Sequence, residues 1–356
     1  MTTTGLADIN TNNLNFRKMT TVLILVFGFL FGAILQYAKL NKFDVISGTA
    51  TRSNFAVPKA IAVAIGLGAI LLNAEIAMGL ASFHTKPLIL GGVILGGIIF
   101  GSGMAILGYC PGTLAISLGE GSVDALFGII GGLIGGLVYT MVLPSISSIL
   151  GPNLGSINIS TAVGGPSPFF FILVFIIGAI FIAAAFFINK KEGGKDYKWL
   201  YAGIALAVLD VIVFLNATTG RPIGASTMFP YLADLSVGFT DNTYFEKIQK
   251  PGNWELIFLI GSFLAGLIVS LIKKDFSIKL IHKEWEKYHG NSSAKRIIWS
   301  LIGGFILVFG ARMAGGCTSG HILSGGMQLA ASSLIFAVFV FVGILVTGKL
   351  FYVRKG

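Results

Sequence analysis

Residues 101–113 read Gly-Ser-Gly-Met-Ala-Ile-Leu-Gly-Tyr-Cys-Pro-Gly-Thr, and residues 309–321 read Phe-Gly-Ala-Arg-Met-Ala-Gly-Gly-Cys-Thr-Ser-Gly-His. In both stretches one glycine stands two residues before the cysteine and another stands seven residues before it. Cys110 and Cys317 are the only cysteines of the chain. Matching frames about 200 residues apart indicate an internal duplication. An isolated cysteine is most often a small buried hydrophobic residue, but a matched pair favours a function for both thiols.

The composition around these stretches is that of a membrane protein. Of the 356 residues, 54% are hydrophobic and only 11% are charged. Several apolar runs reach the ~20 residues that cross a hydrocarbon core. The net charge of +10 comes from basic residues in the loops between these runs, so we expect membrane lipid and no nucleic acid as a partner. Two separate cysteines without a CxxC pair argue against a disulfide framework or a thioredoxin-like site.

The apolar runs predict an all-α membrane protein with about nine transmembrane helices. The expected spans are 20–38, 58–82, 87–108, 122–143, 168–188, 199–216, 254–272, 297–315 and 329–352. The expected divisions are a polar N-terminal tail (1–19), a first transmembrane repeat (20–143), a linker with a central transmembrane helix (144–198) and a second transmembrane repeat (199–356). Because one span separates two sets of four, the sequence predicts two inverted four-helix repeats plus a linking helix.

Basic residues set the expected orientation. Lysines gather within 190–198 and 273–295, after the fifth and seventh spans, so both loops are expected in the cytoplasm. This arrangement places the N-terminus outside and the C-terminus inside, with Arg17 and Lys18 in mild conflict. The polar start of the chain lacks the basic segment of a secretion signal, so we expect the first span to be retained. The two cysteine segments then approach a central pathway from opposite sides.

Short re-entrant helices are expected at both cysteines. Pro111 suits the first turn of a helix that begins at Cys110, and the positive end of such a helix faces an anion. The residues after Cys317 offer comparable donors from the other side. Two surface turns at helix ends are the alternative. The candidate pathway residues around the two cysteines are Gly112, Thr113, Thr318, Ser319 and Gly320.

Other polar residues near the spans are also candidates. The segment that contains Thr219 and Arg221 places an Arg-Pro pair between glycines beside a span, which suggests re-entry into the membrane. Arg312 precedes Cys317 by five residues, and an intramembrane arginine indicates a functional site. It either binds an anionic substrate or pairs with an acid such as Asp210. His321 is a further pathway candidate.

No metal or other cofactor is expected. Cys317 and His321 are too few ligands for zinc, and the sequence has no second cluster. It also has no GxxxxGK[ST] motif for ATP. We interpret His84, His282 and His289 as solvated loop residues.

In these motifs the chain resembles the YeeE/YedE sulfur-transport membrane proteins, which import thiosulfate and related sulfur compounds. The resemblance rests on residues 103–113, 219–224 and 312–321 in this order. It implies an hourglass-like bundle of inverted repeats in the cytoplasmic membrane, in which the substrate passes along cysteine thiols. Carried over to this chain, Cys317 is the outer relay thiol and Cys110 the inner one. A cytoplasmic sulfur-carrier protein is the partner that the resemblance implies.

One feature departs from that family pattern. Thiosulfate importers of the family typically carry another cysteine after the first span, where this chain reads Lys42-Phe43-Asp44-Val45. An ionised aspartate beside the path of a dianion is unfavourable. Either Asp44 is peripheral, or the substrate is another sulfur or selenium compound.

Two other classes of protein compete with a transporter. A membrane thiol enzyme, such as a sulfurtransferase or thiol oxidoreductase, requires a base beside its cysteine, and only His321 near Cys317 meets that condition. In a structural membrane subunit the matched cysteines would be accidental. The sequence favours transport of thiosulfate or a related small sulfur-containing anion.

Overall fold

Helices form almost the whole of the described chain. The computed structural model describes residues 4–353, and their side chains from residue 20 onward. Within this part, eight helical segments are long and apolar enough to cross a membrane, which confirms the expected all-α membrane fold. They are Thr20–Tyr37, Ala56–Ala77, Leu90–Gly119, Val123–Leu150, Pro168–Glu192, Thr243–Ile272, Ser293–Met327 and Ala331–Phe351. The other expected span, 199–216, is the shorter helix Lys198–Phe214.

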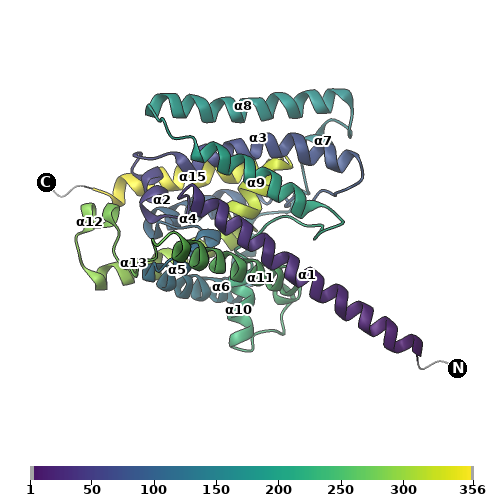
Figure 1. The fold of residues 1–356 in the computed structure, drawn as a ribbon, viewed down its shortest axis with the longest axis horizontal. Coiled ribbons are helices and arrows are strands. Elements are labelled where there is room, and N and C mark those ends of the chain that lie inside the picture. The colour runs from purple at the N-terminus through teal and green to yellow at the C-terminus, as the bar shows by residue number, and fades with distance from the viewer. Residues whose placement is uncertain (1–3, 354–356) are drawn as a thin grey trace.

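The helices fall into two series with a helix pair between them (Figure 1). The first series is α1 (Thr4–Tyr37), α2 (Phe43–Ala50), α3 (Ala56–Ala77), α4 (Leu90–Leu107), α5 (Pro111–Gly119) and α6 (Val123–Leu150). The pair is α7 (Ile159–Ala162) and α8 (Pro168–Glu192). The second series is α9 (Lys198–Phe214), α10 (Met228–Ser236), α11 (Thr243–Ile272), α12 (Lys283–His289), α13 (Ser293–Met313), the π-helix η1 (Thr318–Leu323), α14 (Ser324–Met327) and α15 (Ala331–Phe351).

Contacts between the two series are reciprocal. Helix α1 packs on α11, and α9 packs on α3. Likewise α6 packs on α13, and α15 packs on α4. The central helices α4 and α13 pack on each other, while α8 covers α3 at the edge of the molecule (Figure 1). Such an exchange of partners is the packing expected of two related repeats, so each half is completed by the other.

Glycine permits the close crossing of α4 and α13. A Cβ atom on Gly103 would lie 2.4 Å from the backbone nitrogen of Leu307, and one on Gly310 would lie 2.4 Å from that of Phe100. Gly103 and Gly310 are the glycines seven residues before the two cysteines. Gly103 meets Leu307, and Gly310 meets Phe100. The offset along the chain from Gly103 to Gly310 equals the offset from Phe100 to Leu307, which supports a duplication. Small residues are needed here because they let helix backbones meet in lipid.

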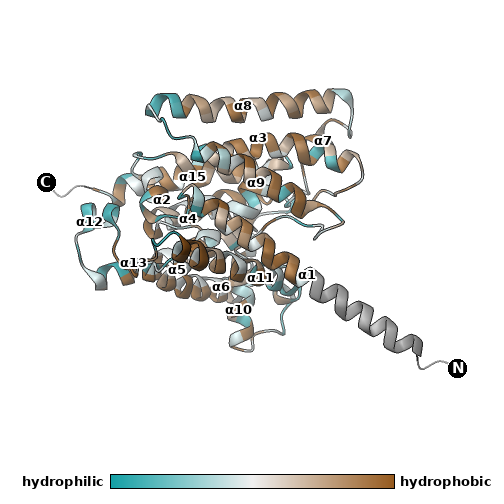
Figure 2. Ribbon diagram, viewed as in Figure 1, coloured by the Kyte–Doolittle hydropathy of each residue, from teal (hydrophilic) through white to brown (hydrophobic). Residues whose placement is uncertain are grey.

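The loops collect on two faces of the bundle. One face, called the basic face below, joins loop 38–55, which contains α2, loop 120–122, and loop 273–292, which contains α12. Here the backbone N–H of Val123 donates to the backbone carbonyl of Lys279 (2.7 Å). The opposite face joins loops 78–89, 151–167 and 328–330, where Ala331 N–H donates to the carbonyl of Ile157 (2.9 Å). Figure 2 shows hydrophilic residues gathered on α12 at the basic face and an apolar band across the helices.

The two ends of the described bundle lie on different faces. Helix α1 reaches the basic face at its C-terminal end, so its span starts on the opposite face. Helix α15 ends on the basic face, where Tyr352 packs against Tyr288 with ring centroids 5.3 Å apart. Side chains of the predicted polar tail, including Arg17 and Lys18, lie outside the described residues. Pro144, the start of the expected linker, lies within α6, which continues to Leu150.

Candidate functional site

Two matching breaks interrupt the central helices. Helix α4 ends at Leu107 and is capped by Gly108, which has a left-handed φ of 79°, and α13 is followed by Gly315 with a φ of 78°. Both are the glycines two residues before a cysteine. The cysteines themselves have extended backbones, and each is the N-cap of the segment that follows, α5 or η1. The glycine frames seen in the sequence therefore build the same turn twice.

Cys110 is fixed at the start of α5 by its own helix. Its backbone N–H donates to Thr113 Oγ1 (2.8 Å), and that hydroxyl lies 3.4 Å from Cys110 Sγ. Pro111 occupies the first turn, as expected. At Gly112 a Cβ would lie 3.3 Å from the ring of Phe31, so a larger residue crowds α1 against α5.

Cys317 is buried at the second break. Its Sγ lies 3.3 Å from Ser319 Oγ, and the neighbouring Thr318 Oγ1 donates to Met104 Sδ (3.8 Å). Met104 belongs to α4, on the other half. The π-helical turn η1 is wider than an α-helix, and such turns occur frequently at functional sites.

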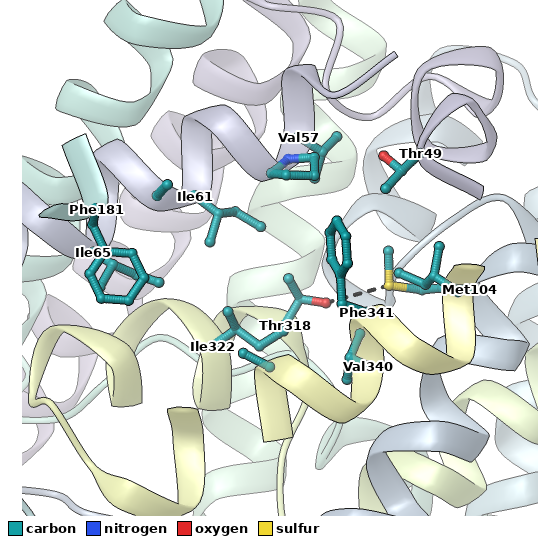
Figure 3. Close-up of a pocket in the computed structure, with 14 residues that line it drawn as sticks. Thr49, Val57, Ile61, Ile65, Met104, Phe181, Thr318, Ile322, Val340 and Phe341 are labelled. Carbon is teal, nitrogen blue, oxygen red and sulfur yellow. Dashed lines mark hydrogen bonds between the residues drawn. The ribbon is translucent and has the colours of Figure 1, made fainter. Parts of the chain in front are cut away.

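One apolar cavity borders both breaks. This central cavity has a volume of about 50 Å³ and is lined at the first break by Cys110 and Thr113. At the second break it is lined by Thr318 and Ser319, the residues that follow Cys317. A lateral cavity of about 210 Å³ reaches Thr318 and Met104 between α3, α8 and α15 (Figure 3). The two halves thus enclose a shared space that borders Cys110 and the two residues after Cys317.

A polar route leads from the opposite face to Cys317. A narrow cavity, called the neck below, has a volume of about 20 Å³. Its lining is Lys86, Arg221, Pro222, Ile223, Gly224, Ser226, Thr227, Glu255, Gly315, Gly316, Cys317 and Gly320. A wider mouth of about 560 Å³ shares Lys86 and Arg221 with the neck and is also lined by His84, Lys250 and Trp254. The expected residues Arg221 and Gly320 are therefore at the neck.

Arg221 is held at the neck by two neighbours. Its Nη2 lies 3.8 Å from Glu255 Oε1, and its guanidinium lies 4.5 Å from the ring centre of Trp254. Burial lowers the pKa of Arg221, with Glu255 opposing the shift. Glu255 also accepts from the backbone N–H of Thr227 (2.5 Å) and Met228 (3.2 Å), at the start of α10.

Arg312 does not pair with Asp210. It donates to Tyr244 Oη (2.8 Å) and to the hydroxyls of Ser226 (3.2 Å) and Thr227 (3.1 Å). Within residues 20–353 no carboxylate lies in ion-pair range of its guanidinium. Asp210 instead accepts from Ser324 Oγ (2.6 Å). Arg312 therefore holds the polar wall of the neck and adds positive charge behind it.

Residues 39–346 match the profile of a family described as sulphur transport. The chain belongs to this family. The thiosulfate transporter TsuA of Spirochaeta thermophila is 26% identical over 334 residues, which cover 90% of this chain and 95% of that protein. The thiosulfate transporter TsuA of Escherichia coli strain K12 is 22% identical over 323 residues, covering 83% and 84%. The resemblance seen in the motifs is confirmed, and this member of the sulphur transport family is a membrane transporter rather than an enzyme.

Four of the expected pathway residues, Gly112, Thr219, Arg312 and His321, line none of the cavities described above. The contacts of Gly112 and Arg312 have been given. His321 Nε2 lies 3.0 Å from the carbonyl of Ala314 and Nδ1 lies 2.7 Å from Ser333 Oγ, so Nε2 donates and Nδ1 accepts. The ring stacks on Phe336 and ties the second break to α15. Thr219 donates to the carbonyl of Val213 (2.8 Å) and closes the end of α9. Both side chains are used in positioning, which sequence spacing alone did not reveal.

A buried polar cluster supports the Cys110 break from the basic face. The carboxylate of Asp124 accepts hydrogen bonds from Arg296 Nη2 (2.5 Å) and Tyr109 Oη (3.2 Å). It also lies 3.1 Å from His282 Nε2. Arg296 also donates to the carbonyl of Leu107 (2.6 Å), the last residue of α4. The side chain of His282 is only 12% exposed, so its interpretation as a solvated residue was wrong. The cluster joins loop 273–292 to the residue before Cys110.

The position of Asp44 follows from the same face. Its Oδ1 accepts from the backbone N–H of Glu284 (2.9 Å), at the start of α12. Neighbouring Phe43 stacks on His282, with centroids 5.0 Å apart. Asp44 lines none of the four cavities described above, so it is peripheral to them. Within residues 20–353 no group of three His, Cys, Asp or Glu side chains is placed to hold a metal ion.

Proposed function

We propose that this chain carries thiosulfate, or a related small sulfur-containing anion, across the cytoplasmic membrane, and that Cys317 and Cys110 contact it in turn. Two relatives that align with more than four fifths of the chain are named thiosulfate transporters. The shared central cavity carries the proposal, because a relay requires both breaks to border one space.

The chemistry of a thiol suits this substrate. The terminal sulfur of thiosulfate is soft, and an S–H group is a weak donor that contacts such an atom without trapping it. A thiolate would repel a dianion, so the relay uses neutral thiols and forms no covalent bond. At Cys110 the substrate also meets the positive end of α5, whose first N–H groups lack helical partners.

The proposed orientation follows from charge. Lysines crowd the loops of the basic face, which we assign to the cytoplasm. Cys317 is then the outer thiol and Cys110 the inner one, with the N-terminus outside and the C-terminus inside. Labelling of terminal tags in intact cells checks this, and two tags accessible from one side contradict it.

The basic face is also the place for a partner. Lys273, Lys274 and Lys283 are exposed on loop 273–292, next to the inner end of the route. We propose that a cytoplasmic sulfur-carrier protein with an acidic surface docks there. Replacing the three lysines by glutamate should abolish salt-sensitive binding of such a carrier to reconstituted protein, and unchanged binding contradicts the assignment.

Uptake of ³⁵S-thiosulfate into proteoliposomes tests the function. Cys110→Ala and Cys317→Ala should each abolish uptake, while the exposed Ser147→Ala control retains it. Uptake that survives both cysteine changes would exclude the relay. Folded wild-type protein without uptake would exclude thiosulfate, and sulfide, polysulfide and selenium compounds would then be tested.

A further inference from the structure

Lys86 is a cation without a partner at the outer end of the route. Its carbonyl accepts from Ser332 Oγ (2.8 Å), which fixes the backbone of loop 78–89 to the start of α15. Its Nζ makes no hydrogen bond or ion pair with any residue of the described part, although the side chain lines both the mouth and the neck. Burial and then the nearby Arg312 lower the pKa of Lys86. An ammonium in such surroundings is stabilised by an anion.

The charges around the neck do not cancel. Lys86, Arg221 and Arg312 contribute three positive charges, and Glu255 contributes one negative charge. The carboxylate of Glu255 is already bound by two backbone N–H groups at the start of α10 and lies near Arg221. At the mouth, burial lowers the pKa of His84, which favours the neutral form of its ring. A surplus of two positive charges matches a dianion better than a monoanion.

The neck also separates hard from soft contacts. At its outer end stand Lys86 and Arg221, which also line the mouth and bind oxyanion oxygens well. The hydroxyls of Ser226 and Thr227, held by Arg312, also line the neck. Cys317, the sulfur-bearing residue of the cavity, lines the neck but not the mouth. An ion with charged oxygens at one end and a polarisable sulfur at the other complements this arrangement.

We propose that Lys86 and Arg221 form an outer recognition site for doubly charged sulfur oxyanions, with the oxygens on these two cations and the sulfur directed to Cys317. The proposal rests on the proposed function and names its substrate class. Dianions enter the neck and monoanions such as hydrosulfide are rejected. Sulfate, which lacks the soft sulfur, binds this site and competes for it without passing Cys317.

Calorimetric titration of the purified protein tests the site directly. Lys86→Gln should weaken the binding of thiosulfate and of sulfate about tenfold to a hundredfold, as expected for a lost charge-assisted contact. Because Lys86 Nζ has no partner in the fold, this change leaves folding intact. Arg221→Gln should weaken binding similarly. The control Lys247→Gln removes the same charge one turn from the mouth, on an exposed part of α11, and should bind as wild type does.

Two further outcomes separate the site from the transport function. Wild-type uptake with a KM unchanged by Lys86→Gln would overturn the site and leave transport standing. Absence of thiosulfate uptake, with sulfate and thiosulfate still bound in a Lys86-dependent way, would overturn transport and support the site. If Lys247→Gln weakens anion binding as much as Lys86→Gln does, the loss reflects general surface charge, and the proposal is overturned. Hydrosulfide that inhibits thiosulfate uptake as strongly as sulfate would contradict the selection for dianions.

Discussion

Gly108 and Gly315 adopt the same left-handed backbone at the two breaks, yet they meet different surroundings. A methyl group on Gly108 would lie 2.2 Å from the ring of Phe43, whereas one on Gly315 would meet no atom within 4 Å. Cys317 faces a cationic neck, while Cys110 faces an apolar cavity and is braced by a buried ion-pair cluster. The two halves therefore share the turn that presents a thiol and differ in what surrounds it.

The largest expected effect comes from replacing each cysteine by serine, which keeps a polar group and removes the sulfur. Cys317→Ser and Cys110→Ser should each lower thiosulfate uptake at least tenfold, because a hydroxyl is a harder and smaller partner for a terminal sulfur. Initial rates in proteoliposomes measure this. Full uptake by Cys110→Ser alone would show that the inner break needs only a polar group. Sulfur would then be required at Cys317 but not at Cys110.

Next in size is the response of the two glycine turns to alanine. Gly315→Ala should cost about 1–3 kcal/mol of stability, because it forces a left-handed conformation on a residue with a Cβ. Gly108→Ala should cost about 1–3 kcal/mol more, since its methyl also overlaps Phe43. Thermal unfolding in detergent ranks them.

A second substitution sharpens that ranking. In the Phe43→Leu background the difference between the two alanine variants should shrink, because the overlapping ring is gone. A Gly315→Ala variant that is less stable than Gly108→Ala would contradict the difference in surroundings.

His321 should affect stability without affecting recognition. His321→Leu breaks its hydrogen bonds with Ser333 and Ala314 and should cost about 1–3 kcal/mol. Ser333→Ala should lower the melting temperature similarly. Neither change should alter the KM for thiosulfate more than about twofold, since the ring lies outside the neck. A tenfold rise in KM with unchanged stability would restore His321 to the pathway.

The smallest effect is the pH dependence of outer binding. Lys86 binds an anion only when protonated, and burial holds its pKa below 10.5, the value of an isolated lysine. Binding should therefore weaken as pH rises through that lowered pKa, at a lower pH than an ordinary lysine requires. The groups facing it are Arg221, Arg312, Glu255 and Cys317. Lys86→Arg keeps the positive charge, so the binding of thiosulfate by this variant should depend less on pH. Wild-type binding that is equally independent of pH contradicts the role of Lys86.

Local patterns predicted the parts of the molecule that depend on neighbours in sequence. Apolar runs located the spans, and glycine spacing located the two breaks. The proline after Cys110 predicted the start of α5. Arg221 was found because its flanking glycines and proline mark a loop beside a span.

Contacts between the halves were not predictable in this way. Lys86 was not among the candidates from the sequence, and only its place beside Arg221 and Glu255 at the neck gives it a site. Glu255 lies in a helical run with no sign that it binds the start of α10. The absence of a cysteine near Asp44 left two alternatives open, a peripheral aspartate or a different substrate, and its contact with α12 could not be read from the sequence. Each of these residues acquires its role from a partner far away in the chain.

During synthesis, Asp124 is made before Arg296, its ion-pair partner. The two residues are 172 positions apart, which is about 9–34 s of synthesis at ~5–20 residues per second. During that interval α6 is in the membrane while the cation that neutralises its carboxylate has not left the ribosome. The first half is therefore an incomplete folding unit, and its maturation depends on the arrival of α13 rather than on its own sequence.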